Sequence, residues 1–419
     1  MKIVLCNKYF FLNGGTEKYL RDVMHCFAST GHEPVPFSVR YAGNWQSPYS
    51  HLFLPPPGNE HQTRFEHIRL RPAGIIRHLD RSIYSVEARL YLTRLLREIG
   101  GADVAYLLNI YNYMSPSVIH TLKKFRIPVV LQIGDYNLLC PSYLFLRQGM
   151  PCTLCARGSY LPALRYRCVK ENLWLSAVRV LAMLVHRLLH IYDLVDAFVV
   201  PSAFMRDRLL EGGFSPERLH LIAYPVSEPT ARRSEKRNYI LYFGRIIYEK
   251  GLDILIQAFQ QLPAGPELVL IGRSYSGERE RLEKLIYSNC RSRIRFLDFM
   301  EGEELSRWIE GALVSVVPSR WPDNAPLSVY ESFMHGTPVL GANIGALSEQ
   351  IQNGVTGMLF RPGSVNDLGA KLVLMLESRE RLIDMGNAAK EYAIREHSMQ
   401  NHMARLLLLF ESVRENARV

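Results

Sequence analysis

Two carboxylates, Asp323 and Glu331, stand on either side of a predicted helix start in the segment 318–340. The preceding run 312–317 is short and apolar and has a strand-like composition, which predicts a buried strand. Cap and turn residues follow it, and 327–334 is the predicted helix. Amides at about 326–329 would lack intrahelical acceptors, so an anion such as a diphosphate would be stabilised there. The predicted anion site comprises Asn324, Ala325, Pro326, Leu327, Ser328 and Val329.

Two cations follow the first predicted strand of the second half of the chain. That strand, 239–243, leads into Gly244 and Arg245, and Lys250 comes five residues after the arginine. Preorganised cations stabilise a departing diphosphate without a metal, because its negative charge grows in the transition state. Gly272 ends the next predicted strand, where a glycine would admit a nucleobase or ribose against the backbone.

Four of the seven cysteines fall within one short segment of the first half. They are Cys140, Cys152, Cys155 and Cys168. A Cys-x-x-Cys pair with two further thiols has the number and spacing for one tetrahedral zinc, although reduced free thiols and an iron–sulfur cluster fit the same pattern. Four protein ligands would leave no open position, so such a zinc would be structural.

Strand-like and helix-like segments alternate along both halves of the chain. In the first half, predicted strands lie near 2–6, 33–39, 103–108, 128–133, 197–200 and 219–223, and predicted helices near 15–30, 78–99, 115–125, 172–192 and 203–211. The polar, charged segment 225–238 is the predicted linker. Further predicted strands lie near 239–243, 267–271, 294–297, 312–317 and 338–340. Such alternation predicts two doubly wound parallel sheets in series, with ligands at the carboxyl ends of their strands.

Positive charge is concentrated in the first half of the chain. The net charge is +10, and residues 1–226 hold 26 Lys+Arg against 16 Asp+Glu. Eight arginines lie between His61 and Glu98, which predicts either a patch for an anionic partner or a solvated helix face. The helix near 172–192 carries Arg179, His186, Arg187 and His190 at helical spacing. This spacing indicates either an interfacial helix with a basic stripe or a core helix with one solvent-exposed edge.

The segment from Asp323 to Glu331 resembles the signature of family-4 glycosyltransferases of the GT-B fold. The resemblance is strong over 239–360 and looser before it. It implies a GT-B fold, an α/β architecture of two Rossmann-like doubly wound domains facing a central cleft. The expected domains are 1–226 on the acceptor side, with a Cys-rich insertion at 138–171, and 227–395 for the nucleotide-sugar donor. The last segment, 396–419, is expected to cross back to the first domain as a helix.

The resemblance also implies roles for individual residues. Arg245 and Lys250 match the family's diphosphate-binding cations, while Asp323 would contact the donor sugar and Glu331 the ribose. Gly14 and Gly15 match a Gly-Gly-x-Glu loop that faces the donor phosphates. The chain departs from the pattern twice, because it has Asp323 where Glu is commoner and Gly134 where His usually precedes Asp135. Asp135 is expected near the acceptor.

The implied activity is that of a retaining, metal-independent glycosyltransferase. It would move a sugar from a nucleoside-diphosphate sugar to a saccharide or lipid-linked saccharide, in bacterial envelope or exopolysaccharide synthesis. The start of the chain lacks the shape of a signal peptide, which predicts a cytoplasmic protein. An anionic membrane surface is a further expected partner, which would place the protein at the inner face of the membrane, and nucleic acid is not expected.

Two other functions fit parts of the sequence. A nucleotide-sugar epimerase of the same fold would use the same donor site without an acceptor. A basic, Cys-cluster nucleic-acid-binding protein would use the arginines and cysteines, but it would not need the paired acids and cations of the second half.

Overall fold

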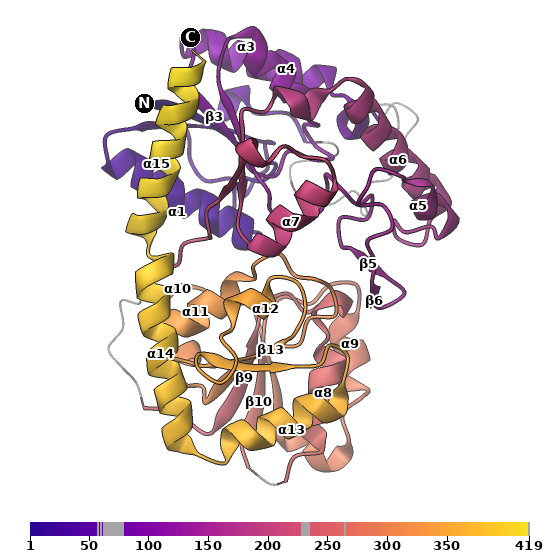
Figure 1. The fold of residues 1–419 in the computed structure, drawn as a ribbon, viewed down its shortest axis with the longest axis vertical. Helices are drawn as coiled ribbons and strands as arrows, with labels where there is room; N and C mark the ends of the chain where they lie inside the picture. Colours follow the sequence, from indigo (N-terminus) through magenta and orange to yellow (C-terminus); the bar gives the residue numbers. More distant parts are fainter. Residues whose placement is uncertain (57, 59–60, 62–78, 228–234, 264, 418–419) are drawn as a thin grey trace.

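The structure is a computed structural model that describes residues 1–56, 58, 61, 79–227, 235–263 and 265–417. Two six-stranded parallel sheets lie one in each half of the chain (Figure 1). Neighbouring residues of one strand point to opposite faces, so Val4 and Ile3 belong to different hydrophobic clusters. Both faces of the first sheet are therefore covered, and the predicted architecture of two doubly wound parallel sheets is confirmed.

The first sheet has the strand order β2-β1-β3-β4-β7-β8. Its strands are β1 (Lys2–Cys6), β2 (Glu33–Phe37), β3 (Val104–Leu107), β4 (Val129–Gln132), β7 (Ala197–Val200) and β8 (Leu219–Leu221). Its helices are α1 (Gly15–Ser29), α3 (Val86–Glu98), α4 (Ser117–Lys124), α5 (Leu161–Arg165), α6 (Leu173–Leu188) and α7 (Ala203–Glu211). A short hairpin, β5 (Leu146–Arg147) and β6 (Met150–Pro151), precedes α5.

The second sheet has the order β11-β10-β9-β12-β13-β14. Its strands are β9 (Tyr239–Phe243), β10 (Glu267–Ile271), β11 (Ile294–Leu297), β12 (Val314–Val317), β13 (Val339–Ala342) and β14 (Gly357–Phe360). The helices around it are α8 (Leu252–Gln260), α9 (Glu278–Glu283), α10 (Gly302–Gly311), α11 (Leu327–Met334), α12 (Leu347–Gln350), α13 (Val365–Leu376) and α14 (Arg379–His397). Strand order reverses beside β1 in one sheet and beside β9 in the other, which is where ligands bind in such sheets.

The last helix, α15 (Met399–Asn416), leaves the second sheet and packs on the first. Met403, Leu406 and Phe410 share a hydrophobic cluster with Ile3 of β1. Tyr19 Oη lies 2.8 Å from His402 Nε2. Helices α14 and α15 run along one side of both halves (Figure 1), so the C-terminal segment ties the two sheets together.

Several local predictions are corrected by the structure. The predicted helix 78–99 is interrupted at 84–85, because the Ser85 hydroxyl accepts a hydrogen bond from Ala88 N and begins α3 anew. Strand β14 was not predicted, since its leading Gly357 is typical of a turn. An added Cβ there would lie 2.0 Å from Val339 O, so close strand pairing requires the glycine. Residues 228–234 of the predicted linker lie outside the described residues.

The predicted arginine patch between His61 and Glu98 lies partly outside the described residues. Arg64, Arg69, Arg71 and Arg77 lie outside the described residues. Arg81 is fully buried and pairs with Glu87 at 2.7 Å, so this residue does not belong to a surface patch. The guanidinium is inside because it also donates a hydrogen bond to Pro55 O at 2.6 Å, which satisfies a loop carbonyl.

Candidate active site

The N-termini of α1 and α11 meet where the two sheets face each other. Gly15 begins α1, and a Cβ added to it would lie 3.1 Å from Leu327 Cδ1 at the start of α11. Gly14 has an extended backbone that any residue adopts, so its own φ does not require glycine. The close approach at Gly15 brings together two helix ends whose unpaired amides favour an anion.

Lys250 and Asp323 form a buried ion pair between two loops of the second half. Their side chains are 14% and 8% exposed, and Ser319 Oγ also donates to the Asp323 carboxylate at 3.1 Å. Gly251 allows this meeting, because its φ is +69° and an added Cβ would lie 2.1 Å from Pro318 O. The loop after β9 therefore packs directly on the loop after β12.

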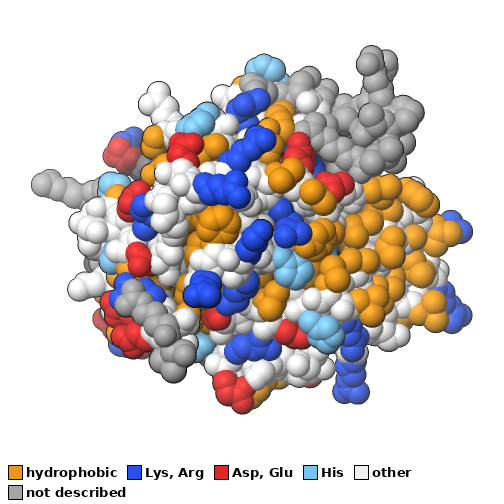
Figure 2. All heavy atoms as spheres, turned by 90° about the horizontal axis from the view of Figure 1, so that it is seen from above, with side chains coloured by type: hydrophobic (Ala, Val, Ile, Leu, Met, Phe, Trp, Pro, Cys, Tyr) orange, Lys and Arg blue, Asp and Glu red, His pale blue; other side chains and the backbone are white. Residues whose placement is uncertain are grey.

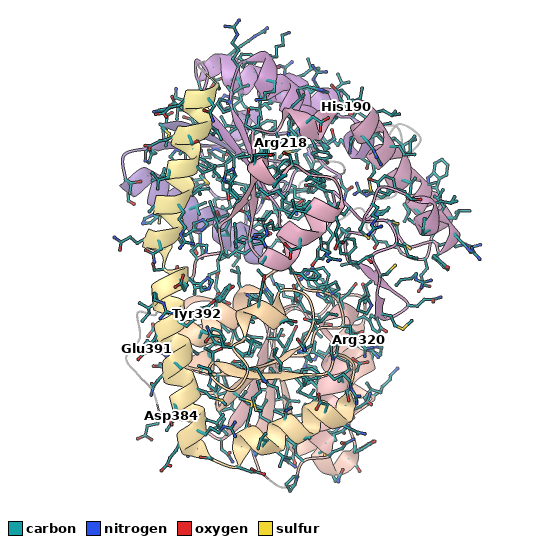
Figure 3. The ribbon with its side chains drawn as sticks, viewed as in Figure 1. His190, Arg218, Arg320, Asp384, Glu391 and Tyr392 are labelled. Carbon is teal, nitrogen blue, oxygen red and sulfur yellow. The ribbon has the colours of Figure 1, made fainter. Side chains whose placement is uncertain are left out.

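A second ion pair holds the neighbouring part of the same loop. Arg320 pairs with Asp253 of α8, and its backbone N donates to Glu249 O at 3.0 Å. Figure 3 labels Arg320 on the part of the second half that faces the first. With both loops anchored, Lys250 and Asp323 are preorganised before any ligand binds.

The predicted anion site also contacts the first half directly. Asn324 Nδ2 donates to Ile133 O, just past β4, at 3.0 Å. Ser202 Oγ donates to Asn324 Oδ1 at 3.2 Å, and Tyr136 Oη donates to Pro322 O. Ser202 Oγ also accepts from Met205 N and so caps the start of α7. The loop that carries Asp323 is thus fixed by residues of both halves.

The amides of the predicted anion site are fewer than expected. Pro326 has no N–H, and Val329 N donates to Pro326 O at 3.1 Å. Within 326–329, Leu327 and Ser328 remain as the amides without an acceptor among the described residues. Ala325 has a φ of +109°, which is strained for a residue with a Cβ. The prediction of four amides is therefore corrected to two.

Glu331, the expected ribose acceptor, is paired with a cation of the first half. Lys18 Nζ of α1 donates to Glu331 Oε1, and the two side chains are 36% and 13% exposed. The charge of Glu331 raises the pKa of Lys18. A ligand hydroxyl that reaches Glu331 would therefore compete with Lys18.

Arg245 stands near the buried acid Glu17, which follows the Gly14-Gly15 loop. Arg245 is exposed, and its guanidinium has no hydrogen-bond or ion-pair partner within the described part of the chain, while its backbone carbonyl accepts from Tyr242 Oη at 2.7 Å. Glu17 accepts a hydrogen bond from Asn7 Nδ2 at 3.1 Å, and burial raises its pKa while Asn7, Lys8 and Arg245 oppose that rise. The free cation and the amides of α1 thus lie at the same interface.

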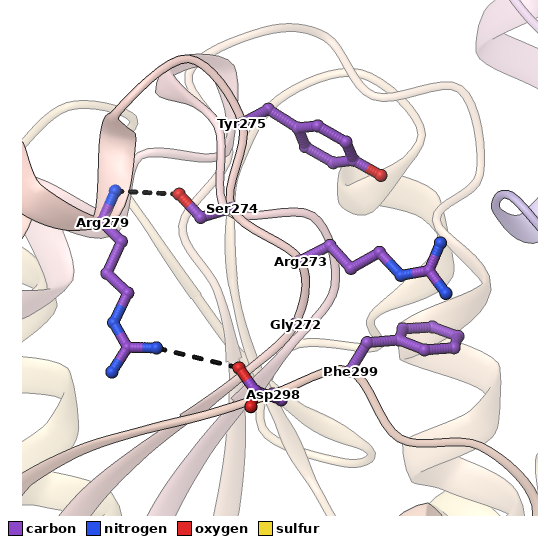
Figure 4. A pocket seen from close by; sticks show the side chains of 7 residues that line it. All are labelled: Gly272, Arg273, Ser274, Tyr275, Arg279, Asp298 and Phe299. Atoms are coloured by element: carbon purple, nitrogen blue, oxygen red, sulfur yellow. Dashed lines mark hydrogen bonds and ion pairs between the residues drawn. The ribbon is translucent and has the colours of Figure 1, made fainter. Parts of the chain in front are cut away.

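A cavity of about 460 Å³ opens at the carboxyl ends of β10 and β11 (Figure 4). It is lined by Gly272, Arg273, Ser274, Tyr275, Arg279, Asp298 and Phe299. The Arg273 guanidinium lies 4.5 Å from the Phe299 ring centroid. Gly272 has a second reason to be glycine, since an added Cβ would lie 1.8 Å from the carbonyl of Gly244. The volume falls in the range of small-molecule sites.

Asp135 and Gly134 lie past the end of β4, on the first-half side. Asp135 Oδ1 accepts hydrogen bonds from Asn137 N at 2.9 Å and from Asn137 Nδ2 at 2.7 Å, so its carboxylate closes a turn. Burial raises its pKa. A Cβ added to Gly134 would lie 3.6 Å from Tyr224 Oη, an ordinary contact, so packing does not explain the missing histidine.

All four clustered cysteines line one small cavity of about 20 Å³. The pKa of Cys155 is raised to about 12, mainly by burial and to a lesser extent by the neighbouring thiols of Cys140 and Cys168. All four are free thiols. Nevertheless, across the described residues, no three or more His, Cys, Asp or Glu side chains are arranged to hold a metal ion. Coordination of one ion would therefore need rotation of these side chains.

Two family models match nearly the whole chain. Residues 14–225 match the Glycosyl transferase 4-like domain, and residues 227–392 match Glycosyl transferases group 1. The first of these models covers half of the chain, so the chain belongs to the Glycosyl transferase 4-like family and is of the family-4, GT-B type.

Curated relatives share this family at moderate identity. The chain is 30% identical to the sulfoquinovosyl transferase SQD2 of Arabidopsis thaliana over 301 residues, which are 66% of this chain and 55% of that protein. It is 32% identical to D-inositol 3-phosphate glycosyltransferase of Nocardia farcinica over 192 residues, 42% of each chain. The chain spans about half the length of such relatives.

Solved structures share the fold over the full length. Sucrose-phosphate synthase from Thermosynechococcus elongatus superposes with a TM-score of 0.71 at 17% identity, covering 98% of both chains. HepE of Anabaena, solved in complex with UDP, gives 0.67 at 15% identity, covering 98% of this chain and all of that chain (100%).

Sequence reasoning missed the residues that join the two halves. Lys18, Tyr136 and Asn324 make their contacts over separations of 313, 186 and 191 residues. Of these only Asn324 was expected at the site, as a member of the predicted anion site. Lys18 stands beside Glu17 in the Gly-Gly-x-Glu loop, so its position next to that motif was the available signal.

Proposed function

We propose that this glycosyltransferase moves a sugar from a nucleoside-diphosphate sugar to a saccharide or lipid-linked saccharide, with retention of configuration. The observation that carries the proposal is the buried Lys250–Asp323 pair in a loop that leads into the N-terminus of α11, which meets the N-terminus of α1. Arg245 acts on Glu17 of α1 and supplies the second cation. Such a constellation stabilises a departing diphosphate without a catalytic metal.

Each part of the donor has a proposed position. The diphosphate binds between the N-termini of α1 and α11, next to the two cations. The sugar contacts Asp323, the ribose contacts Glu331, and the base occupies the cavity beside Gly272 and Phe299. The UDP complex of HepE supports a nucleotide at this fold, and the acceptor hydroxyl approaches from the side of Asp135 and the Gly134 carbonyl.

The proposed acceptor is an anionic, lipid-linked saccharide of envelope or exopolysaccharide synthesis at the inner face of the membrane. The basic first half of the chain supports it, since the anionic carrier and its membrane would be attracted there.

A screen of nucleoside-diphosphate sugars by thermal shift tests the donor site. A ligand at a hundred times its dissociation constant adds about 2.7 kcal/mol of stability, which is readily measured. Chromatography of the donor after incubation then distinguishes the products of transfer or hydrolysis from the isomerised donor that an epimerase would release. The absence of any shift or turnover across the panel would remove the donor-site proposal.

Replacement of Lys18 with Met is expected to tighten nucleoside-diphosphate binding severalfold. The change frees Glu331 from a partly exposed ion pair, which is worth about 0.2–1 kcal/mol. Calorimetric titration of both proteins measures it, with Lys18→Arg as the charge-preserving control. Weaker binding by Lys18→Met would mean that Lys18 itself contacts the donor.

We also propose that the four cysteines hold a structural zinc. The insertion contains several non-glycine residues with positive φ, among them Tyr143, Phe145 and Arg167, and such backbone persists only where other interactions hold it. A cation would also keep Cys155 ionised against its raised pKa.

Purified protein is therefore expected to contain about one zinc ion per chain. Cys152→Ser and Cys155→Ser should each lose the metal and destabilise the protein, whereas Cys26→Ser on α1 should keep it. Elemental analysis together with thermal unfolding provides the measurement. Metal-free wild-type protein with unchanged unfolding after zinc addition contradicts the proposal.

A further inference from the structure

Helix α6 packs with its polar side chains toward the protein. Arg179 is buried, and its Nη2 donates to Asn137 Oδ1 at 2.7 Å. His186 Nε2 donates to Ile83 O at 2.5 Å, and burial lowers the pKa of His186 to about 4, so the ring is neutral at pH 7. Of the two alternatives predicted for this helix, the basic stripe is therefore wrong for these two residues, and a core-facing side is correct. His190, labelled in Figure 3 past the end of α6, is exposed and pairs with Asp193 instead.

The opposite side of α6 exposes large apolar side chains. Trp174 is 65% exposed, Leu184 is 42% and Leu188 is 77%. Leu161 of α5 adds a side chain that is 72% exposed. We name this the α5–α6 face, and it comprises Leu161, Leu173, Trp174, Leu181, Leu184, Leu188 and Leu189. Figure 2 shows it as a broad hydrophobic area at one edge of the molecule, with Lys and Arg side chains around it.

The charge around this face is strongly one-sided. Between 151 and 190 the exposed basic residues are Arg157, Arg165, Arg167, Lys170 and Arg187. Glu171 is the acid in that range. Seven large apolar side chains exposed on one face call for a partner. The basic residues near them require that partner to be anionic.

We propose that the α5–α6 face docks on an anionic lipid bilayer, with the leucines and Trp174 in the headgroup–acyl boundary. This combination of exposed Leu and Trp with flanking Arg and Lys is typical of segments that lie in the interface plane. No helix within the described residues is long and apolar enough to cross a membrane. A second copy of the chain fits less well, because a symmetric contact would bring two basic rims together.

The Cys-rich insertion at 138–171, which carries α5, links this face to the proposed active site. Its β5–β6 hairpin reaches the second half, where a Cβ added to Gly149 would lie 2.8 Å from Tyr248 Oη. Tyr248 belongs to the turn that ends at Lys250. Docking would therefore present the first-half side of the site to the membrane, an inference about acceptor delivery that rests on the proposed lipid-linked substrate.

Co-sedimentation of the full-length protein with vesicles tests the proposal. Wild-type protein should bind phosphatidylglycerol-containing vesicles at least tenfold more tightly than pure phosphatidylcholine vesicles. Leu184→Gln/Leu188→Gln should lose at least tenfold in binding to the anionic vesicles, because each leucine loses its apolar burial. Leu408→Gln provides the matched control, since Leu408 is 66% exposed on α15.

Nucleotide-induced thermal shifts without lipid, and light scattering, are measured on the same proteins. If the double variant keeps the nucleotide-induced thermal shift, its loss of vesicle binding is independent of the proposed donor site. If the wild-type protein binds vesicles but shows no thermal shift with nucleotide, the donor-site proposal is overturned and docking is not. Equal vesicle binding by wild type and double variant overturns docking. A wild-type dimer that the double variant converts to monomer, without vesicle binding by either, assigns the face to self-association instead.

Discussion

Arg245→Ala is expected to lower kcat/KM by about 10²–10³ while leaving thermal unfolding unchanged. Loss of one preorganised donor to a developing charge typically has an effect of that size. The Arg245 side chain is exposed and has no hydrogen-bond or ion-pair partner among the residues described, so its truncation breaks neither kind of interaction, and the backbone carbonyl that accepts from Tyr242 Oη is kept. The expected loss is therefore purely catalytic, and steady-state kinetics with a calorimetric scan measure both quantities.

Two control variants make the Arg245 result interpretable. Arg245→Lys keeps the charge but not the guanidinium fork, and it should recover part of the lost rate. Arg291→Ala removes another exposed arginine from the second half and should leave kinetics unchanged. If Arg245→Ala turned over donor at the wild-type rate, the assignment of the diphosphate site would be wrong.

Lys250→Met is expected to abolish activity and also to destabilise the protein. The Asp323 carboxylate, 8% exposed, would be left buried without its counter-charge. Breaking a buried pair costs about 3–5 kcal/mol, and at about 2–4 °C per kcal/mol for a domain of this size the fall in Tm is on the order of 10 °C. Thermal unfolding and donor turnover measure the two losses separately.

The double variant Lys250→Met/Asp323→Asn distinguishes the two roles of Lys250. Replacement of the charged carboxylate with an amide removes the unpaired buried charge, so most of the lost stability should return. Activity should stay absent, since neither the cation nor the sugar-binding acid is present. A Tm for Lys250→Met equal to that of the wild type would show that the pair contributes nothing to folding.

Much of the architecture was predictable because it depends on local sequence. The run 327–334 was predicted as a helix and is α11 with those bounds, since a proline precedes it and apolar residues fill it. The alternation of strand-like and helix-like segments is also a local pattern, and it predicted both sheets. The interrupted helix before α3 and the short strand β14 were not predicted, because a serine cap and a glycine in a tight pairing look like ordinary turn residues in sequence.

The sequence by itself determined which residues could bind a diphosphate, and the tertiary structure decided how they are held. Asp323 was expected to reach the sugar and is paired with Lys250, while Glu331 was expected at the ribose and is paired with Lys18. Both pairs depend on packing between loops far apart in sequence, which no local pattern encodes. The same holds for helix α6. Helical spacing predicted that Arg179 and His186 share one face, but it did not predict that this face points inward. Buried hydrogen-bond acceptors at Asn137 and Ile83 decided it, and they left the leucines outside.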